Sequence, residues 1–288
     1  MAEKLQTISE IRRLLAGMFK GQWSPGEAGA MATVLIREYT AMDGAHQLAY
    51  GTQSVSPETV ALIMSAGRRA ASGEPIQYII GYTLFCGQRI EVGPGVLIPR
   101  PETEEMTAMI IAENQGFDGT VMDLCTGSGC IAISVAAAFP GAEVYGTDNS
   151  ETALTKAARN AASNNAAVKL FLADILTAPA ASFPVSDIII SNPPYVRRSE
   201  MKLMRPNVLD HEPHEALFVS DDDPLIYYRS IASIASERLR MNGIMYLEIN
   251  EALGSESAGL FLKSGFVSVT VTEDINSRKR FLKASKNG

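Results

Sequence analysis

Residues 187–195 read Asp-Ile-Ile-Ile-Ser-Asn-Pro-Pro-Tyr, an apolar run that leads directly into two successive prolines. The run at 187–190 predicts a buried strand. The strand has to end there because neither Pro193 nor Pro194 can donate a hydrogen bond to a strand ladder. Asn192 and Tyr195 are therefore expected in a rigid loop at the carboxyl end of a strand. In an open α/β sheet, that edge is where ligands bind.

Strand and helix patterns alternate on both sides of this loop. The expected strands are 121–124, 143–148, 168–172, 185–190 and 243–249, accompanied by helices at 131–139, 150–163, 225–239 and 252–264. This alternation is typical of parallel βαβ units. Two last strands, 266–271 and 278–283, are joined by a short polar turn and are expected to pair antiparallel. We therefore predict an α/β fold with a doubly wound, Rossmann-like, seven-stranded sheet whose last strand is antiparallel.

The N-terminal part of the chain has a helical pattern instead. Helix starts are indicated by Thr7 with Glu10, by Ser24 with Glu27, and by Ser56 with Pro57. Segments 78–82 and 89–92, separated by Gly87, are typical of a hairpin. We predict a small helical substrate-recognition domain at 1–75, a β-hairpin linker at 76–98 and the α/β domain at 99–288.

The composition is that of an ordinary globular protein. Hydrophobic residues make up 46% of the chain and charged residues 20%, and no apolar run approaches the ~18 residues that span a bilayer. The first residues lack the basic and apolar regions of a signal peptide. We expect a cytoplasmic protein that is monomeric and has no membrane contact.

Metal and nucleic-acid binding are both disfavoured. Cys86, Cys125 and Cys130 show no CxxC spacing, and the three histidines form no HExxH motif. The net charge of −7 argues against a protein that gains affinity by neutralising many phosphates. We therefore expect no metal site and no direct contact with nucleic acid.

A glycine-rich turn, Gly127-Ser128-Gly129, lies between the strand at 121–124 and the helix that follows. Glycines allow a ligand to approach the backbone closely, and a helix N-terminus offers free N–H groups. Asp148 follows 19 residues after Gly129, at the end of the next strand, close to the ~20 expected for a carboxylate that binds ribose hydroxyls. The spacing predicts an adenosine-type ligand.

Acidic residues at three strand ends narrow the choice of ligand. Asp123 would repel the pyrophosphate of NAD at the glycine turn, whereas it suits the cationic ammonium and sulfonium groups of S-adenosylmethionine. Asp174 can accept a hydrogen bond from the adenine amine, with Ile175 as apolar cover for the ring. The three carboxylates therefore favour S-adenosylmethionine.

The chain resembles the HemK/PrmC family of class I S-adenosylmethionine-dependent methyltransferases, which modify glutamine in peptide chain release factors. The resemblance lies in Asp123-Leu-Cys-Thr-Gly-Ser-Gly129, in Asn192-Pro-Pro-Tyr195, in Leu97-Ile-Pro-Arg-Pro-Glu-Thr-Glu104 and in the preceding Gly73-Glu-Pro-Ile-Gln-Tyr-Ile-Ile-Gly81. His211-Glu-Pro213, followed by Ala216 and Leu217, is similar to the family as well. Cys125 departs from the pattern, since glycine is common at that position.

The resemblance implies a methyl transfer to the N5 atom of the glutamine in a Gly-Gly-Gln loop, with S-adenosylhomocysteine as the second product. It implies that the cofactor is bound by Asp123, Cys125, Thr126, Gly127, Ser128, Gly129, Asp148, Asn149, Asp174, Ile175 and Asn192. Asn192, Pro193, Pro194 and Tyr195 would hold the substrate and carry catalysis, with Arg100 and Glu102 as further substrate contacts. The Asn192 Oδ1 and Pro193 carbonyl oxygens are expected to accept both amide hydrogens, while Tyr195 packs against the amide.

Three other functions are alternatives for a chain with this glycine turn, these strand-end carboxylates and the loop at 192–195. An adenine-N6 DNA or RNA methyltransferase would hold an exocyclic amine in the same loop and stack Tyr195 on a flipped base. A catalytically silent module would keep the fold and only bind a partner. An NAD-dependent dehydrogenase is disfavoured by Asp123 and by the absence of an evident acid–base pair.

Overall fold

The computed structural model describes residues 6–287, and its internal contacts divide the chain into two units. The first unit comprises the chain up to Gly81 together with Pro206–His211, and the second comprises Tyr82–Arg205 and Glu212–Gly288. Within the described range, no helix has the length and apolar character needed to cross a membrane.

The first unit is a small helical bundle. Its elements are β1 (Gln6–Thr7), α1 (Ile8–Phe19), α2 (Pro25–Thr40), α3 (Gly44–Ala49), β2 (Ser54–Val55), α4 (Pro57–Ala71), α5 (Ile76–Ile80) and α9 (Pro206–Leu209). Capping boxes begin α1 at Thr7 and α2 at Ser24, as the sequence predicted. The apolar faces of α1, α2 and α4 meet in a core that includes Ile11, Leu35 and Ile63, all fully buried.

The second unit is built on a seven-stranded sheet with the order β12-β13-β11-β8-β5-β6-β7. Its strands are β5 (Thr120–Leu124), β6 (Glu143–Asp148), β7 (Val168–Leu172), β8 (Ser186–Ser191), β11 (Leu239–Glu248), β12 (Phe266–Glu273) and β13 (Lys279–Lys286). The neighbours β11-β8-β5-β6-β7 pair parallel, whereas β13 pairs antiparallel with both β11 and β12. The predicted fold class is confirmed, including the antiparallel last strand.

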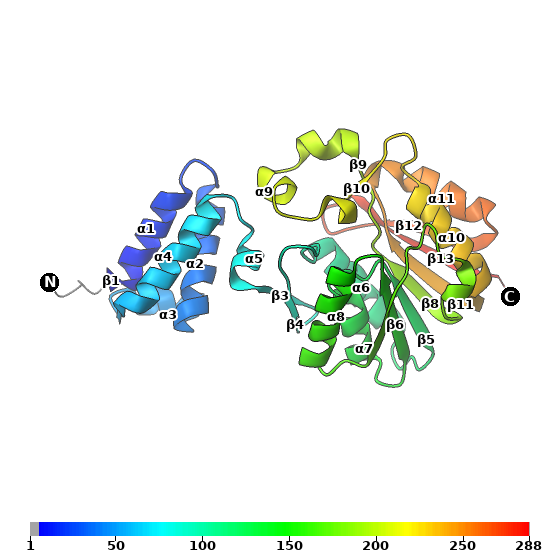
Figure 1. The fold of residues 1–288 in the computed structure, drawn as a ribbon, viewed down its shortest axis with the longest axis horizontal. Coiled ribbons are helices and arrows are strands. Elements are labelled where there is room, and N and C mark those ends of the chain that lie inside the picture. Colours follow the sequence, from blue (N-terminus) through cyan, green and yellow to red (C-terminus); the bar gives the residue numbers. More distant parts are fainter. Residues whose placement is uncertain (1–5, 288) are drawn as a thin grey trace. The chain divides into compact units, whose positions relative to one another are not determined.

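Helices cover both faces of this sheet, as Figure 1 shows. One layer contains α6 (Pro101–Glu113), α7 (Cys130–Ala138) and α8 (Glu151–Ser163), and the other contains α10 (Ile226–Arg238) and α11 (Gly254–Lys263). The strands β5 and β8 are buried on both sides, which explains the apolar run at 188–190 in β8 and the apolar pair at 121–122 in β5. The topological switch lies between β5 and β8, so the carboxyl ends of these two strands flank the expected ligand site.

The strand expected at 78–82 is wrong except for its last residue, Tyr82. Residues Ile76–Ile80 form the short helix α5, which ends at Gly81 in the left-handed conformation, with φ +85°. Tyr78 and Ile79 are buried, and Ile79 belongs to the core of the helical unit. This burial outweighs the strand preference of the isoleucines. The hairpin itself is present, formed by β3 (Tyr82–Phe85) and β4 (Gln88–Glu91).

The segment from 196 to 223, for which no regular pattern was expected, contains several short elements. They are β9 (Val196–Arg197), the 3-10 helices Arg198–Leu203 and His214–Ala216, the helix α9 and β10 (Phe218–Val219), which pairs parallel with β9. Two more 3-10 helices occur at Ala180–Ser182 and Glu251–Leu253. None is longer than six residues, so each is too short to produce a detectable hydrophobic period.

Candidate active site

A cleft of about 950 Å³, open to solvent on one side, lies at the carboxyl ends of the parallel strands. Most of the residues predicted to bind a cofactor line it, namely Cys125, Thr126, Gly127, Ser128, Asp148, Asn149, Asp174, Ile175 and Asn192. Pro194 and Arg100 line it too. The folded chain therefore brings together strand ends that are up to 67 residues apart in sequence, as the hydrogen bond from Ser191 Oγ to the Leu124 carbonyl shows.

The glycine turn has the backbone conformation that the sequence predicted. Gly127 and Gly129 have φ values of +56° and +81°, in the left-handed region that favours glycine. A Cβ on Gly129 would lie 3.1 Å from Ala157 Cβ, so the close approach of α7 and α8 also requires a glycine here. The Gly127 N–H donates to Asp148 Oδ2 at 2.9 Å, which ties the turn to the end of β6. Gly129 does not line the cleft, and its role is in the shape of the turn.

Asp123 does not face the ligand space as expected. It is fully buried beneath the turn, is absent from the lining of the cleft, and accepts a hydrogen bond from the Thr126 hydroxyl. Burial raises the pKa of Asp123 to about 7, and the Thr126 hydrogen bond opposes this shift. Asp123 therefore supports the glycine turn from beneath, and its carboxylate does not line the cleft in which an ammonium group would bind.

This burial makes stability depend on pH. With a pKa of about 7 in the folded protein against a usual 3.8, the group favours folding while it is protonated, and this contribution is lost as the pH rises through about 7. Asp123→Asn keeps an acceptor for Thr126 but cannot ionise. We expect its melting temperature, relative to wild type, to rise by roughly 5 °C between pH 5 and pH 8. Asp118→Asn, at an exposed site before β5, is the control. If the melting temperature of Asp123→Asn differed from that of wild type by the same amount at pH 5 and pH 8, the raised pKa of Asp123 would be contradicted.

Asp148 and Asp174 both line the cleft, at the ends of β6 and β7. The Asp148 carboxylate also accepts from the Ser150 N–H at 3.0 Å, which holds it in place, and burial raises its pKa. Asp174 accepts from the Leu176 N–H at 2.9 Å, and Ile175 beside it is buried. Two carboxylates are thus fixed at neighbouring strand ends, with apolar cover next to the second.

Cys125 occupies a strained backbone position in the same turn. Its φ of +61° is unusual for a residue with a side chain, and burial raises the pKa of its thiol well above the ordinary value. A raised pKa keeps the sulfur protonated, and a thiol is a poorer nucleophile than a thiolate. The departure from glycine is therefore accommodated without introducing a reactive group.

The loop after β8 divides its residues between the cleft and an adjoining pocket. Asn192 lines both, Pro194 lines the cleft, and Pro193 and Tyr195 line the adjoining pocket. Asn192 Nδ2 donates to Thr103 Oγ1 at 2.9 Å, and the Tyr195 hydroxyl donates to Glu248 Oε1 at 2.7 Å. Both functional side chains of this loop are therefore held by residues outside it.

Arg100 lines both pockets, whereas Glu102 lines neither. The Arg100 guanidinium pairs with Glu212 at 2.8 Å, and the other oxygen of the Glu212 carboxylate accepts from the Ile98 N–H at 3.0 Å. Because Glu212 is almost fully buried, this pair fixes the segment that carries Arg100 over the cleft. The structure does not place Glu102 at the site.

Sequence reasoning missed several residues of the site. Thr103, Glu215 and Tyr227 line the cleft, and Glu248 and Glu212 support it. Glu248 ends the apolar strand β11, the same signal that singled out Asp148 and Asp174, so it could have been found. The others follow from no periodicity in the sequence, because they depend on which segments the fold brings to the cleft.

The charges in the cleft fit S-adenosylmethionine. Among the described residues that line it, three carry carboxylates, Asp148, Asp174 and Glu215, and Arg100 is the only Lys or Arg. Such a lining favours a ligand with ribose hydroxyls, an amine and positive charge, and disfavours a pyrophosphate. These carboxylates, and not the buried Asp123, would repel the pyrophosphate of NAD.

Comparison with known proteins identifies relatives over both units. The model of the PrmC N-terminal domain matches residues 22–81, and the model of the methyltransferase small domain matches residues 83–212. A release factor glutamine methyltransferase of Bacteroides thetaiotaomicron is 44% identical over 76% of this chain and 78% of the relative. Another, of Cereibacter sphaeroides, is 38% identical over 90% of this chain and 91% of the relative.

Solved structures support the fold alone. A methyltransferase of Pyrococcus furiosus superposes with a TM-score of 0.50 at 19% identity, covering 81% of this chain and all of that protein. A 16S ribosomal RNA methyltransferase of Thermus thermophilus, solved with AdoMet and guanosine, gives a TM-score of 0.52 at 18% identity over 72% of this chain and 50% of that one. With the sequence relatives covered over more than two thirds of their length, the chain belongs to the release factor glutamine methyltransferase family.

Proposed function

We propose that the protein transfers the methyl group of S-adenosylmethionine to the side-chain amide nitrogen of the glutamine in the Gly-Gly-Gln loop of peptide chain release factors. The observation that carries the proposal is the setting of Asn192, whose amide is held by Thr103 at the edge of a cleft lined by Asp148 and Asp174. Family membership supplies the class of substrate.

The cofactor would be held by the turn at 125–128 and by the two strand-end carboxylates. Asp148 would accept from the ribose hydroxyls, and Asp174 from the adenine amine, with Ile175 and Tyr227 as apolar neighbours of the ring. When bound, S-adenosylmethionine supplies an electrophilic methyl group and its own leaving group.

The chain's own task is to position the substrate amide. An amide nitrogen is a weak nucleophile because its lone pair is delocalised into the carbonyl. Asn192 Oδ1 and the Pro193 carbonyl oxygen would accept its two hydrogens, which orients the nitrogen toward the methyl carbon and favours its rehybridisation. Among the described residues lining the cleft there is no His or Lys to act as a base, and none is required because the proton can leave after transfer.

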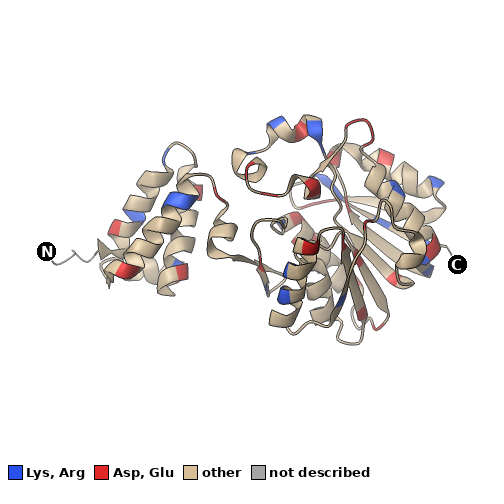
Figure 2. Ribbon diagram, in the orientation of Figure 1, with Lys and Arg blue, Asp and Glu red and all other residues tan. Residues whose placement is uncertain are grey.

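We assign recognition of the release factor to the N-terminal helical domain and to Arg100. For the domain the support is its match to the PrmC N-terminal domain. For Arg100 it is position, since this residue lines both the cleft and the adjoining pocket. In this proposal the enzyme acts as a monomer in the cytoplasm, where release factors work on ribosomes. Figure 2 shows Lys and Arg interspersed with Asp and Glu along both units, a pattern that favours a protein substrate over a nucleic acid.

The proposal is tested with tritiated S-adenosylmethionine and three acceptors assayed separately. The acceptors are a bacterial release factor, the same factor with the loop glutamine replaced by alanine, and duplex DNA. We expect label on the intact release factor alone, located on the glutamine by peptide mass spectrometry. Label on DNA without label on the release factor would overturn the proposal in favour of an adenine methyltransferase.

A further inference from the structure

We propose that Glu248 is a positioning residue that, through the Thr103 hydroxyl, sets which atom of the Asn192 amide faces the substrate. This inference deepens the proposed function and rests on it. Glu248 ends β11, Thr103 lies in the first turn of α6 and Asn192 follows β8, so three separate elements meet at one buried carboxylate.

The contacts form an unbroken chain of hydrogen bonds. Asn192 Nδ2 lies 2.9 Å from Thr103 Oγ1, and Thr103 Oγ1 lies 2.6 Å from Glu248 Oε2. The second carboxylate oxygen, Glu248 Oε1, lies 2.7 Å from the Tyr195 hydroxyl. Glu248 is fully buried and Thr103 is 2% exposed, so the hydrogen bond between these two side chains is shielded from water.

The chemistry of the three side chains allows only one direction for this series of hydrogen bonds, from Asn192 through Thr103 to Glu248. An ionised carboxylate only accepts hydrogen bonds, so the single hydroxyl hydrogen of Thr103 points to Glu248. The Thr103 oxygen can then only accept, and the Asn192 group that faces it must be the N–H donor. The Asn192 carbonyl oxygen is consequently left for the pocket side, where an acceptor is needed to bind the amine hydrogens of a substrate amide.

If either hydrogen bond ran in the opposite direction, Asn192 would present the opposite end of its amide to the substrate. If Thr103 donated to Asn192, the amide would turn over and present its NH₂ group to the substrate NH₂ group. Two donors would then oppose each other at the position where the nitrogen has to be aligned. Glu248 thus acts on the reaction without touching the substrate, by enforcing the polarity of Thr103.

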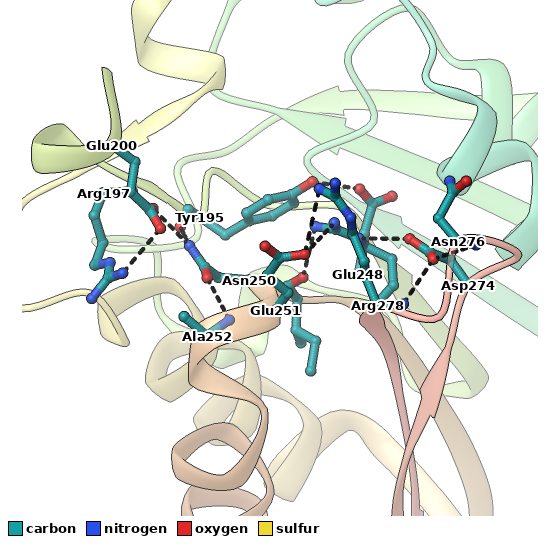
Figure 3. A network of polar contacts seen from close by, with 12 residues as sticks. Tyr195, Arg197, Glu200, Glu248, Asn250, Glu251, Ala252, Asp274, Asn276 and Arg278 are labelled. Atoms are coloured by element: carbon teal, nitrogen blue, oxygen red, sulfur yellow. Dashed lines mark hydrogen bonds and ion pairs between the residues drawn. The ribbon is translucent and has the colours of Figure 1, made fainter. Parts of the chain in front are cut away.

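Glu248 also restrains the other functional side chain of the loop. Figure 3 shows the Tyr195 hydroxyl directed at the Glu248 carboxylate, while the backbone of Tyr195 is contacted by the Asn250 side chain. Asn250 Nδ2 donates to the Tyr195 carbonyl at 3.1 Å and to Glu200 Oε2 at 2.9 Å. Both ends of Tyr195 are therefore fixed, which keeps its ring at the wall of the adjoining pocket.

The pKa of Glu248 is raised above its ordinary value, chiefly by burial. The Thr103 and Tyr195 hydroxyls and the nearby Arg280 guanidinium act in the opposite direction and stabilise the carboxylate form. Replacement of Glu248 by glutamine removes the acceptor-only character, because an amide has to turn one NH₂ group toward one of the two hydroxyls. In either orientation, the hydrogen bond donated by one of the two hydroxyls, Thr103 or Tyr195, is lost.

Three variants and two controls test the inference in the release factor assay. Glu248→Gln and Thr103→Val are expected to lower kcat by about 10²-fold, with KM for the release factor and Kd for S-adenosylmethionine within about threefold of wild type. Thr103→Ser keeps the hydroxyl and is expected to recover most of the rate. Thr107→Val, one turn further along α6, and Glu113→Gln, which removes a different carboxylate that accepts from a tyrosine hydroxyl, are controls that keep wild-type kcat.

A second readout needs no substrate. In ¹⁵N-labelled protein, the Asn192 Nδ2H₂ signals, assigned by their loss in Asn192→Asp, should include one slowly exchanging hydrogen in wild type and in Thr103→Ser. That protection should disappear in Thr103→Val and fall in Glu248→Gln, in which the new amide can turn its NH₂ group toward Thr103. Unchanged protection in all variants, or kcat of Thr103→Val within threefold of wild type, overturns the positioning role. If wild type fails to methylate the release factor, the proposed function fails, and the exchange measurement still decides whether Glu248 orients Asn192.

Discussion

Replacing Asn192 with alanine is expected to lower kcat for glutamine methylation by on the order of 10³-fold. The substitution removes the Oδ1 acceptor that the fold holds at the edge of the cleft through Thr103. In the proposed site the cofactor would be held by other groups, chiefly Asp148, Asp174 and the turn at 125–128, which line the cleft. The dissociation constant for S-adenosylmethionine should therefore stay within about threefold of wild type.

The two quantities are measured separately, kcat by label transfer to the release factor and binding by calorimetry. Asn276→Ala is the matched control, because Asn276 is exposed in the turn between β12 and β13 and contributes its backbone N–H to Asp274. Turnover of Asn192→Ala at more than a tenth of the control would rule out a mechanism based on orientation of the amide.

The second large effect concerns the cofactor. Asp148→Ala is expected to weaken binding of S-adenosylmethionine by on the order of 10²-fold, since hydrogen bonds from ribose hydroxyls to a half-buried carboxylate are charge-assisted. The same substitution also removes the acceptor for the Gly127 and Ser150 N–H groups, so the turn loses its tie to β6. Both losses act on binding.

Glu143→Gln provides the control for this variant. Glu143 begins the same strand, β6, and its carboxylate forms an exposed ion pair with Lys169, a kind of contact that contributes little to stability. Calorimetric titration with S-adenosylmethionine should separate the two variants, and kcat of Asp148→Ala should partly recover at saturating cofactor. A dissociation constant for Asp148→Ala equal to that of Glu143→Gln would remove the carboxylate from the cofactor site.

Much of the fold could be predicted because its signals are local. The strand at Val168–Leu172 has the predicted bounds, and helices begin at Pro25 and Pro57, directly after the caps Ser24 and Ser56 that indicated them. Residues 78–80 of the helix Ile76–Ile80 were wrongly expected in a strand, since the isoleucines favour strands locally and only burial in the bundle core makes them helical. The short elements between 196 and 219 carry no period at all.

The candidate site divides in the same way. The sequence by itself determined the glycine turn, the strand-end carboxylates Asp148 and Asp174, and the loop that contains Asn192, because each depends on a strand, a turn and a residue type that are neighbours in the chain. The tertiary structure decided that Asp123 lies beneath the turn instead of in the cleft, and that Thr103 and Glu248 orient Asn192. Those contacts join segments 89 and 145 residues apart, and burial and hydrogen-bond direction at such a meeting point exist only once the sheet and its helices have packed.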